Sequence, residues 1–228
     1  MDTLHSIVKQ KHLLKHPFYR LWLKGKLPKE ALQNYAGQYF QLVSNLPRFI
    51  SSLHANCEDE TTRQQLVHHL MEEELGFGNG NVAHTELWLD FAEELNVKRS
   101  EVKNPLLLKA TKNAVATIWN NCQKSLAEGA AALYAYESQV PEISEEKIRG
   151  LREFYGLETV KALRFFTVHA EADKKHRAVW DALSKKLATT LELQRKVKTA
   201  AQETSEALWK MFDAMYEEFV PEKVKIKC

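Results

Sequence analysis

Apolar side chains recur along most of this chain every three to four residues, the spacing at which they share one face of an α-helix. The pattern predicts long helices over about Glu60–Leu75, Glu158–Lys186 and Leu191–Phe219. It also continues through Pro47, so we expect that proline to kink a helix starting near Pro28 rather than to end it. The sequence has no convincing alternation of apolar and polar residues of the kind typical of a β-strand. We therefore predict an all-α bundle of seven to nine helices.

Glycine and proline residues mark the expected breaks between helices. The glycine-rich run Gly76–Gly80 is expected to separate two helices, and Pro141 to close a helix of small residues. Residues 97–104 are polar and are expected to form a link. We expect residues 1–228 to form one helical domain whose tail, residues 220–228, is mobile.

Composition narrows the choice of partners and compartment. Of 228 residues, 44% are hydrophobic, which is enough for a sizeable core, and 32 basic residues nearly balance 30 acidic ones. We therefore expect no nucleic-acid partner, and no apolar run is long enough to predict a membrane partner. The chain has three cysteines without a CxxC spacing, and its first residues lack the pattern of a signal peptide. We expect a cytoplasmic protein.

The most informative motif is an HxxxDxxH spacing formed by His169, Asp173 and His176. At about 100° per residue, these three positions fall within roughly 60° of one another on a helix. Phe166 and Trp180 lie on the same face, so the motif points into an expected core. Buried ionisable groups are costly unless they are paired or bind a metal. The motif therefore predicts either a hydrogen-bonded polar cluster or part of a metal site.

Other acids and histidines on apolar helix faces extend the candidate site. Glu137 lies near the middle of one such face, where it is either a hydrogen-bonded acid or a ligand. The run of three glutamates from residue 72 is most simply a solvated surface, and periodicity does not choose between Glu73 and Glu74. His84 alone is most simply an ordinary histidine. Six oxygen and nitrogen ligands suit two first-row metal ions in a helical bundle better than one zinc ion. The candidate set is Glu73 or Glu74, His84, Glu137, His169, Asp173 and His176.

Several segments resemble a known superfamily of helical bundles. The stretch His16–Tyr19 is similar to the start shared by haem-oxygenase-like proteins, including thiaminase II and the pyrroloquinoline quinone synthase. A more specific resemblance is to the subfamily typified by the chlamydial protein associating with death domains, and it extends from about residue 5 to 218. The segments that carry it are Met71–Gly76, His84–Trp88, Ala131–Pro141, Glu146–Leu151 and Phe166–Asp173.

This resemblance implies a dimetal oxidase that forms para-aminobenzoate, a precursor in folate biosynthesis. It implies two irons or a manganese–iron pair, dioxygen as co-substrate and an external electron donor. It assigns the first carboxylate ligand to Glu73 rather than Glu74 and supports the other five candidates. One departure is the stretch 78–81 before His84, which looks inserted relative to the family pattern.

The resemblance also implies that the enzyme consumes its own side chains. Tyr19 matches the tyrosine that supplies the aromatic ring, and Lys147 matches the lysine implicated as amine donor. Tyr35 and Tyr136 are neighbouring aromatic residues that pack in the core, line the cavity or relay electrons. Without the resemblance, Tyr19 is most simply a core tyrosine and Lys147 a solvated lysine.

Two other functional classes stay open at this stage. The first is a metal-free oxidase or a thiaminase-like hydrolase that acts on an external small molecule; a complete ligand set has no purpose there. The second is a non-enzymatic interaction protein, which only the name of the subfamily suggests. A homodimer is compatible with the resemblance.

Overall fold

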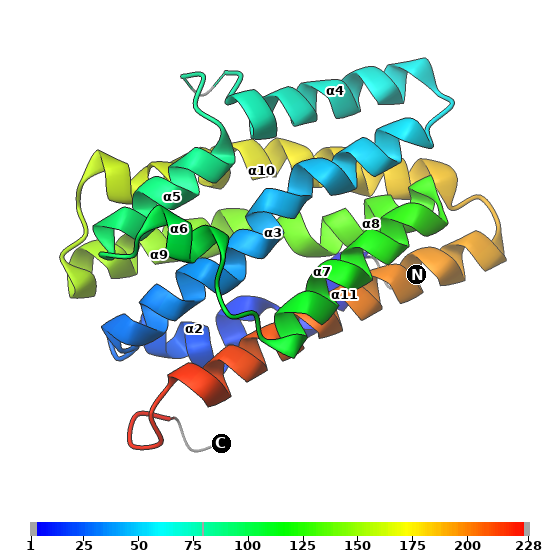
Figure 1. The fold of residues 1–228 in the computed structure, drawn as a ribbon. Coiled ribbons are helices and arrows are strands. Elements are labelled where there is room, and N and C mark those ends of the chain that lie inside the picture. The colour runs from blue at the N-terminus through cyan, green and yellow to red at the C-terminus, as the bar shows by residue number, and fades with distance from the viewer. Residues whose placement is uncertain (1–3, 79, 226–228) are drawn as a thin grey trace.

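The computed structural model describes residues 4–78 and 80–225, and all regular structure in these residues is helical (Figure 1). It contains eleven α-helices and one short 3₁₀ helix, more than the seven to nine expected, because short helices occupy segments that we expected to be continuous or irregular. The elements are α1 Leu4–Gln10, η1 Leu13–Lys15, α2 Pro17–Trp22, α3 Lys29–Ala55, α4 Glu60–Leu75, α5 His84–Glu94, α6 Arg99–Lys103, α7 Lys109–Lys124, α8 Leu126–Glu137, α9 Val140–Tyr155, α10 Val160–Leu187 and α11 Leu191–Phe219.

Three long helices organise the bundle. In Figure 1, α3 crosses in front of α10, with α4 above both and α11 along the lower side. α10 packs against α5, α8 and α9, and α11 packs against α7 and α8. α3 continues through Pro47 to Ala55, as the apolar pattern predicted. Trp22, Trp88 and Trp180 are fully buried, so the space between the helices is filled by large side chains.

Local sequence explains where several helices begin and end. α4 starts after Asp59, whose carboxylate accepts a hydrogen bond from the Thr62 backbone N–H, and ends at Gly76 in the left-handed conformation (φ 65°). α10 starts after Thr159, whose hydroxyl accepts from the Ala162 N–H. α2 starts after His16, whose Nδ1 accepts from the Phe18 N–H.

Some boundaries differ from those expected. Pro141 does not close α8 but lies in the first turn of α9, where a missing N–H costs nothing. The expected polar link 97–104 contains the short helix α6. The apolar spacing also predicts a first helix from Thr3 to Lys15. The structure splits this segment into α1 and η1, and Thr3 lies outside the described residues.

The described part of the tail lies against the bundle. Val220 is buried, and the Lys225 ammonium forms ion pairs with Glu217 and Glu222 at 2.6 Å. Residues 226–228 of the tail expected to be mobile lie outside the described residues.

Candidate metal centre

The HxxxDxxH motif lies in the middle of α10, and all three of its side chains are buried. α10 packs against α8, which carries Glu137 in its last turn. α4 contributes Glu73, and the loop after it leads directly into α5, which begins with His84. Four helices thus bring all six expected ligands into one region of the interior.

One group of possible ligands consists of Glu73, His84 and His169, whose ligand atoms lie within 4.8 Å of one another. The His84 Nδ1 is 2.9 Å from the Glu73 Oε2, and the His84 and His169 ring centroids are 4.5 Å apart. The His169 Nδ1 lies 2.7 Å from the Phe165 carbonyl oxygen. Because a carbonyl only accepts, Nδ1 carries the proton and Nε2 keeps its lone pair for a metal ion.

A second group consists of His69, Glu137 and His176. The Glu137 Oε2 is 3.4 Å from both the His69 Nε2 and the His176 Nδ1. The two imidazole rings stack with centroids 3.6 Å apart. The His69 Nε2 is also 3.7 Å from the Glu73 Oε1, so the two groups adjoin. This arrangement fits two neighbouring ions rather than two unrelated sites.

His69 is the residue that the sequence analysis missed. It precedes Glu73 by four residues, so the two side chains share one face of α4. The HxxxE spacing was therefore a detectable signal, hidden beside the adjacent His68 and the three consecutive glutamates.

Asp173 belongs to neither group of three but contacts the second one. Its Oδ1 lies 2.9 Å from the His176 Nδ1. On the other side of the ring, the His176 Nε2 lies 2.6 Å from the Glu72 Oε2. His176 is thus held between carboxylates on both ring nitrogens.

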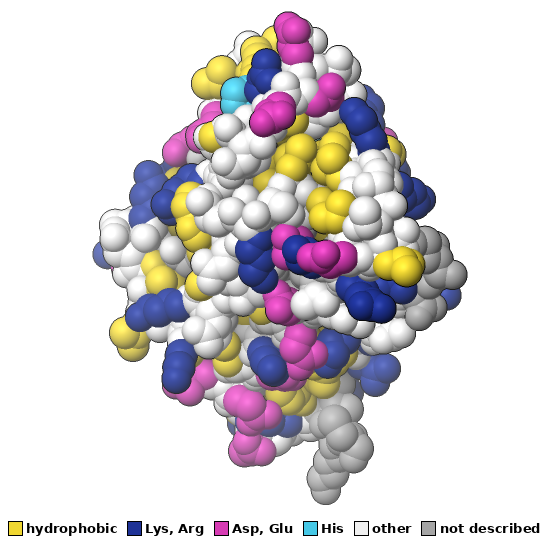
Figure 2. Space-filling model, turned by 90° about the vertical axis from the view of Figure 1, so that its right-hand side faces the viewer, with side chains coloured by type: hydrophobic (Ala, Val, Ile, Leu, Met, Phe, Trp, Pro, Cys, Tyr) yellow, Lys and Arg dark blue, Asp and Glu magenta, His cyan; other side chains and the backbone are white. Residues whose placement is uncertain are grey.

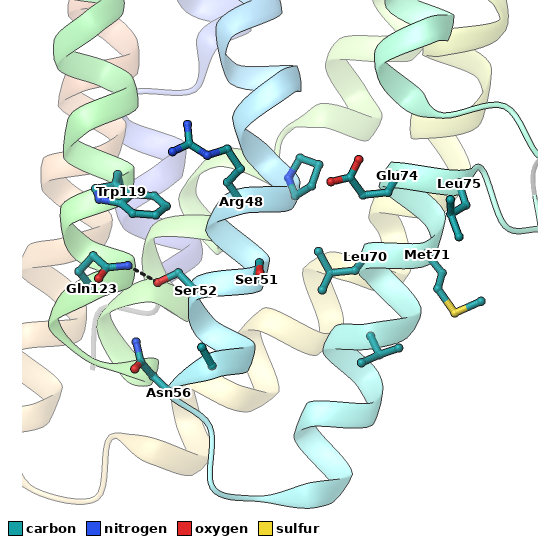
Figure 3. Close-up of a pocket in the computed structure, with 13 residues that line it drawn as sticks. Arg48, Ser51, Ser52, Asn56, Leu70, Met71, Glu74, Leu75, Trp119 and Gln123 are labelled. Carbon is teal, nitrogen blue, oxygen red and sulfur yellow. Dashed lines mark hydrogen bonds between the residues drawn. The ribbon is translucent and has the colours of Figure 1, made fainter.

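Glu74, the alternative to Glu73, points away from the centre. It is exposed and lines an open groove of about 700 Å³ between α3, α4 and α7 (Figure 3). Arg48 of α3 and Trp119 of α7 line the same groove. The structure therefore brings Glu73, and not Glu74, beside the histidines.

The carboxylates and histidines of the cluster shift one another's pKa values. Burial alone would raise the pKa of Glu73, but His84 and His69 hold it well below its usual value. Burial would lower the pKa of His176, but the neighbouring carboxylates of Asp173, Glu137 and Glu72 raise it to about 12. For His169, burial and the nearby His84 lower the pKa. A metal ion binds the deprotonated forms of carboxylates and imidazoles, so an ion at this cluster would displace the proton that the neighbouring carboxylates favour on His176.

Buried polar atoms without hydrogen-bond partners show whether a metal ion would fit the cluster. Within the described residues, several buried atoms of the cluster have no hydrogen-bond partner, among them both Glu137 carboxylate oxygens. Each such atom costs about 1–3 kcal/mol or more if it stays unsatisfied. Divalent metal ions would satisfy these oxygen and nitrogen donors, and a set without thiolates suits iron or manganese. The residues present therefore fit a dinuclear centre. The other unpartnered atoms of the cluster are Glu73 Oε1, Asp173 Oδ2, His69 Nε2 and both ring nitrogens of His84.

Lys147 is buried in a pocket of aromatic rings, not solvated. Its Nζ donates a 2.6 Å hydrogen bond to the Tyr35 hydroxyl and lies 5.4 Å from the centre of the Tyr19 ring. Burial lowers the pKa of Lys147 well below its usual value. Burial thus favours the neutral amine, whose lone pair can act as a nucleophile. The other rings within 6 Å of Nζ are those of Trp22, Tyr39, Trp88 and Phe166.

Aromatic side chains fill the space between this lysine pocket and the metal ligands. Tyr39 stacks on Trp88 at 4.9 Å, Trp88 meets Phe165 at 4.7 Å, and Phe165 stacks on His169 at 4.0 Å. Tyr136, the residue before the Glu137 ligand candidate, is also buried here; burial and the neighbouring Tyr39 raise its pKa. The lysine pocket and the ligand cluster thus form one continuous interior region.

Solved structures with the same arrangement of helices identify the fold. A TenA homologue from Pseudomonas syringae superposes with a TM-score of 0.81, at 15% identity over 94% of this chain and 91% of that one. A domain from Shewanella denitrificans described as having a heme oxygenase-like fold gives 0.77, at 16% identity over 99% and 95%. The fold is therefore the all-α haem-oxygenase-like fold, as predicted.

Sequence comparison places the chain more narrowly. Residues 33–209 match the family described as iron-containing redox enzymes, and the chain belongs to that family. It is 39% identical to the 4-aminobenzoate synthase of Chlamydia muridarum, over 95% of this chain and 90% of the relative. The predicted family resemblance is thereby confirmed.

The surface adds two observations. Acidic and basic side chains are interspersed over the face drawn in Figure 2, in keeping with the balanced charge of the sequence. Among the helices of the described residues, none combines the length and apolar character needed to cross a membrane.

Proposed function

We propose that this enzyme forms 4-aminobenzoate at a dinuclear metal centre and that its own Tyr19 and Lys147 supply the product. The observation that carries the proposal is the buried aromatic pocket of Lys147, which favours the neutral form of its amine. The amine lies 5.4 Å from the centre of the Tyr19 ring, and Tyr19 is also buried. The similarity to the Chlamydia muridarum 4-aminobenzoate synthase supports the choice of product.

The ligand groups suggest how two ions would be held. Glu73, His84 and His169 would hold one ion, and His69, Glu137 and His176 the other. Asp173, with its unpartnered Oδ2, would complete the set. When bound, an iron or manganese–iron pair supplies oxidising equivalents from dioxygen, with an external electron donor returning the centre to its reduced form.

The two consumed side chains have distinct roles in this proposal. The tyrosine ring and Cβ leave the chain when the Cα–Cβ bond of Tyr19 breaks, and Cβ becomes the carboxyl carbon of the product. The Lys147 amine, with a free lone pair, adds to the oxidised ring, and the phenolic oxygen leaves as water. Cleavage of the Lys147 Cε–Nζ bond then frees the product and leaves Cε as an aldehyde, while dioxygen supplies the oxidising equivalents for the ring and for the conversion of Cβ to the carboxyl carbon. Tyr35 accepts a hydrogen bond from Lys147 and so fixes where the amine points.

Substitution of Tyr19 tests the proposal. Tyr19→Phe should bind metal like the wild type but release no 4-aminobenzoate, because a ring without its hydroxyl resists oxidation. The measurement is 4-aminobenzoate by mass spectrometry after protein carrying ring-labelled tyrosine is supplied with iron, manganese, reductant and dioxygen. The wild type should release labelled product and lose mass in the peptide containing Tyr19.

Tyr134→Phe is the matched control, since Tyr134 is also buried but lies on α8 outside the lysine pocket. It should retain product formation. Labelled product from Tyr19→Phe at the wild-type level would show that the ring comes from elsewhere. Unlabelled product from wild-type protein would indicate an external small molecule as substrate.

A further inference from the structure

We propose that Glu72, a residue outside both ligand groups, is a positioning residue that orients His176 for the metal ion it shares with His69 and Glu137. The inference rests on the dinuclear centre of the proposed function. Glu72 is adjacent to Glu73 on α4, but its side chain turns toward α10.

The two nitrogens of His176 face different surroundings. Nδ1 lies on the inner side, 3.4 Å from the Glu137 Oε2 and 2.9 Å from the Asp173 Oδ1. Nε2 lies on the outer side, 2.6 Å from the Glu72 Oε2. Nδ1 is therefore the nitrogen placed to bind an ion, and Nε2 the nitrogen that keeps its proton and donates it in a hydrogen bond.

A carboxylate in this position has two effects on a ligand histidine. It fixes the proton on Nε2, which leaves the lone pair on Nδ1, and it holds the ring at one orientation. His169 has the corresponding support from the Phe165 carbonyl oxygen at its Nδ1. Each group of three thus contains a histidine whose outer nitrogen is engaged, by a backbone oxygen in one and by a carboxylate in the other.

Glu72 is also the part of the cluster nearest to solvent. Its side chain is 30% exposed, whereas those of Glu73 and Glu137 are 1% and 2% exposed. A partly exposed carboxylate can be replaced without leaving a buried unpaired charge, so variants at this position should fold.

The test is anaerobic titration of metal-free protein with Fe²⁺, competed against a chelator so that the two binding steps are resolved. Glu72→Ala should weaken one of the two steps by about 10–100-fold and leave the other within about twofold of the wild type. Glu72→Gln keeps an oxygen that accepts from Nε2 and should recover most of the lost affinity. Glu74→Ala removes the same charge from the same helix, but its side chain lines the outer groove, so it should bind like the wild type.

The outcomes separate this inference from the proposed function. Two unchanged binding steps in Glu72→Ala would overturn the positioning role while leaving the dinuclear centre intact. Equal weakening of both steps, or equal weakening in Glu74→Ala, would show a general charge effect and would overturn it as well. A wild type that binds no Fe²⁺ would instead refute the centre itself.

Discussion

At the scale of single residues, Lys147 illustrates how the fold changes the chemistry of a side chain. In sequence it stands in the charged stretch Glu145–Lys147 and was most simply a solvated lysine; in the structure it is 3% exposed and ringed by aromatic side chains. Only the family resemblance singled it out, because the pocket is built from four separate helices and a sequence pattern reports one helix at a time.

The buried lysine gives a pH prediction. Its pKa is lower in the folded protein than the value of about 10.4 for an unfolded chain. Between these two pKa values the unfolded chain binds one more proton, so stability rises with pH by up to about 1.4 kcal/mol per unit. Lys147→Met removes this dependence. Its free energy of unfolding should exceed that of the wild type most at low pH, and the difference should shrink as the pH approaches 10.

Urea unfolding of metal-free protein at several pH values measures this difference. Lys109→Met, at an exposed position, serves as the control and should follow the wild-type curve. A difference between Lys147→Met and the wild type that stays constant with pH would mean that Lys147 remains charged inside the pocket.

At the scale of elements, α4 depends on the cluster for its attachment. Of its four buried side chains, Thr62, Leu66, His69 and Glu73, only Leu66 is an aliphatic residue. α11 buries many apolar residues by comparison, including Leu208, Met211 and Phe212. Because α4 has so little apolar contact, the polar side chains that would bind metal contribute much of the stability with which it packs on the bundle.

Hydrogen exchange tests this dependence. Adding Fe²⁺ without dioxygen to metal-free protein should slow amide exchange in α4, by up to about 100-fold when free metal is 100 times its dissociation constant. Exchange in the middle of α11 serves as the internal reference and should change little. If α4 and α11 respond alike, metal stabilises the whole bundle and α4 has no special dependence.

The elements also show what the sequence could and could not predict. α4 and α11 begin and end where the apolar periodicity placed them, because each is a long helix ended by capping residues or by Gly76. Pro141 was assigned to the wrong helix because a proline is equally compatible with the end of one helix and the first turn of the next. Helix α6, with five residues and one buried side chain, Val102, is too short to show periodicity.

The same limit applied to the candidate site. The motif on α10 was detectable because its three members lie on one helix. Glu72 acquires its significance only from His176. The spacing of His69 to Glu73 was visible within α4, but His69 is completed as a site only by Glu137 and His176 of other helices. Contacts between side chains on different helices are set by how the helices pack, and they cannot be predicted from the periodicity of a single sequence.

At the scale of the whole molecule, the interior of the bundle contains two adjoining regions, the ligand cluster and the lysine pocket. Carboxylates and imidazoles from α4, α5, α8 and α10 form the ligand cluster, while tyrosine, tryptophan and phenylalanine rings enclose the lysine beside it. The aromatic contacts from Tyr39 through Trp88 and Phe165 to His169 join the two regions. Such an interior excludes water from the lysine amine and places aromatic rings in contact with a histidine of the ligand cluster.

The most direct test of this account is the number of metal ions that the purified chain binds. After anaerobic loading with Fe²⁺ and removal of excess metal, elemental analysis should give about two ions per chain, because each group of three would hold one ion. His84→Ala and His176→Ala should each retain about one, since each removes a ligand from a different group. His68→Ala, at an exposed position beside His69, should keep both. Fewer than about half an ion per wild-type chain would contradict the dinuclear centre on which the proposed function depends.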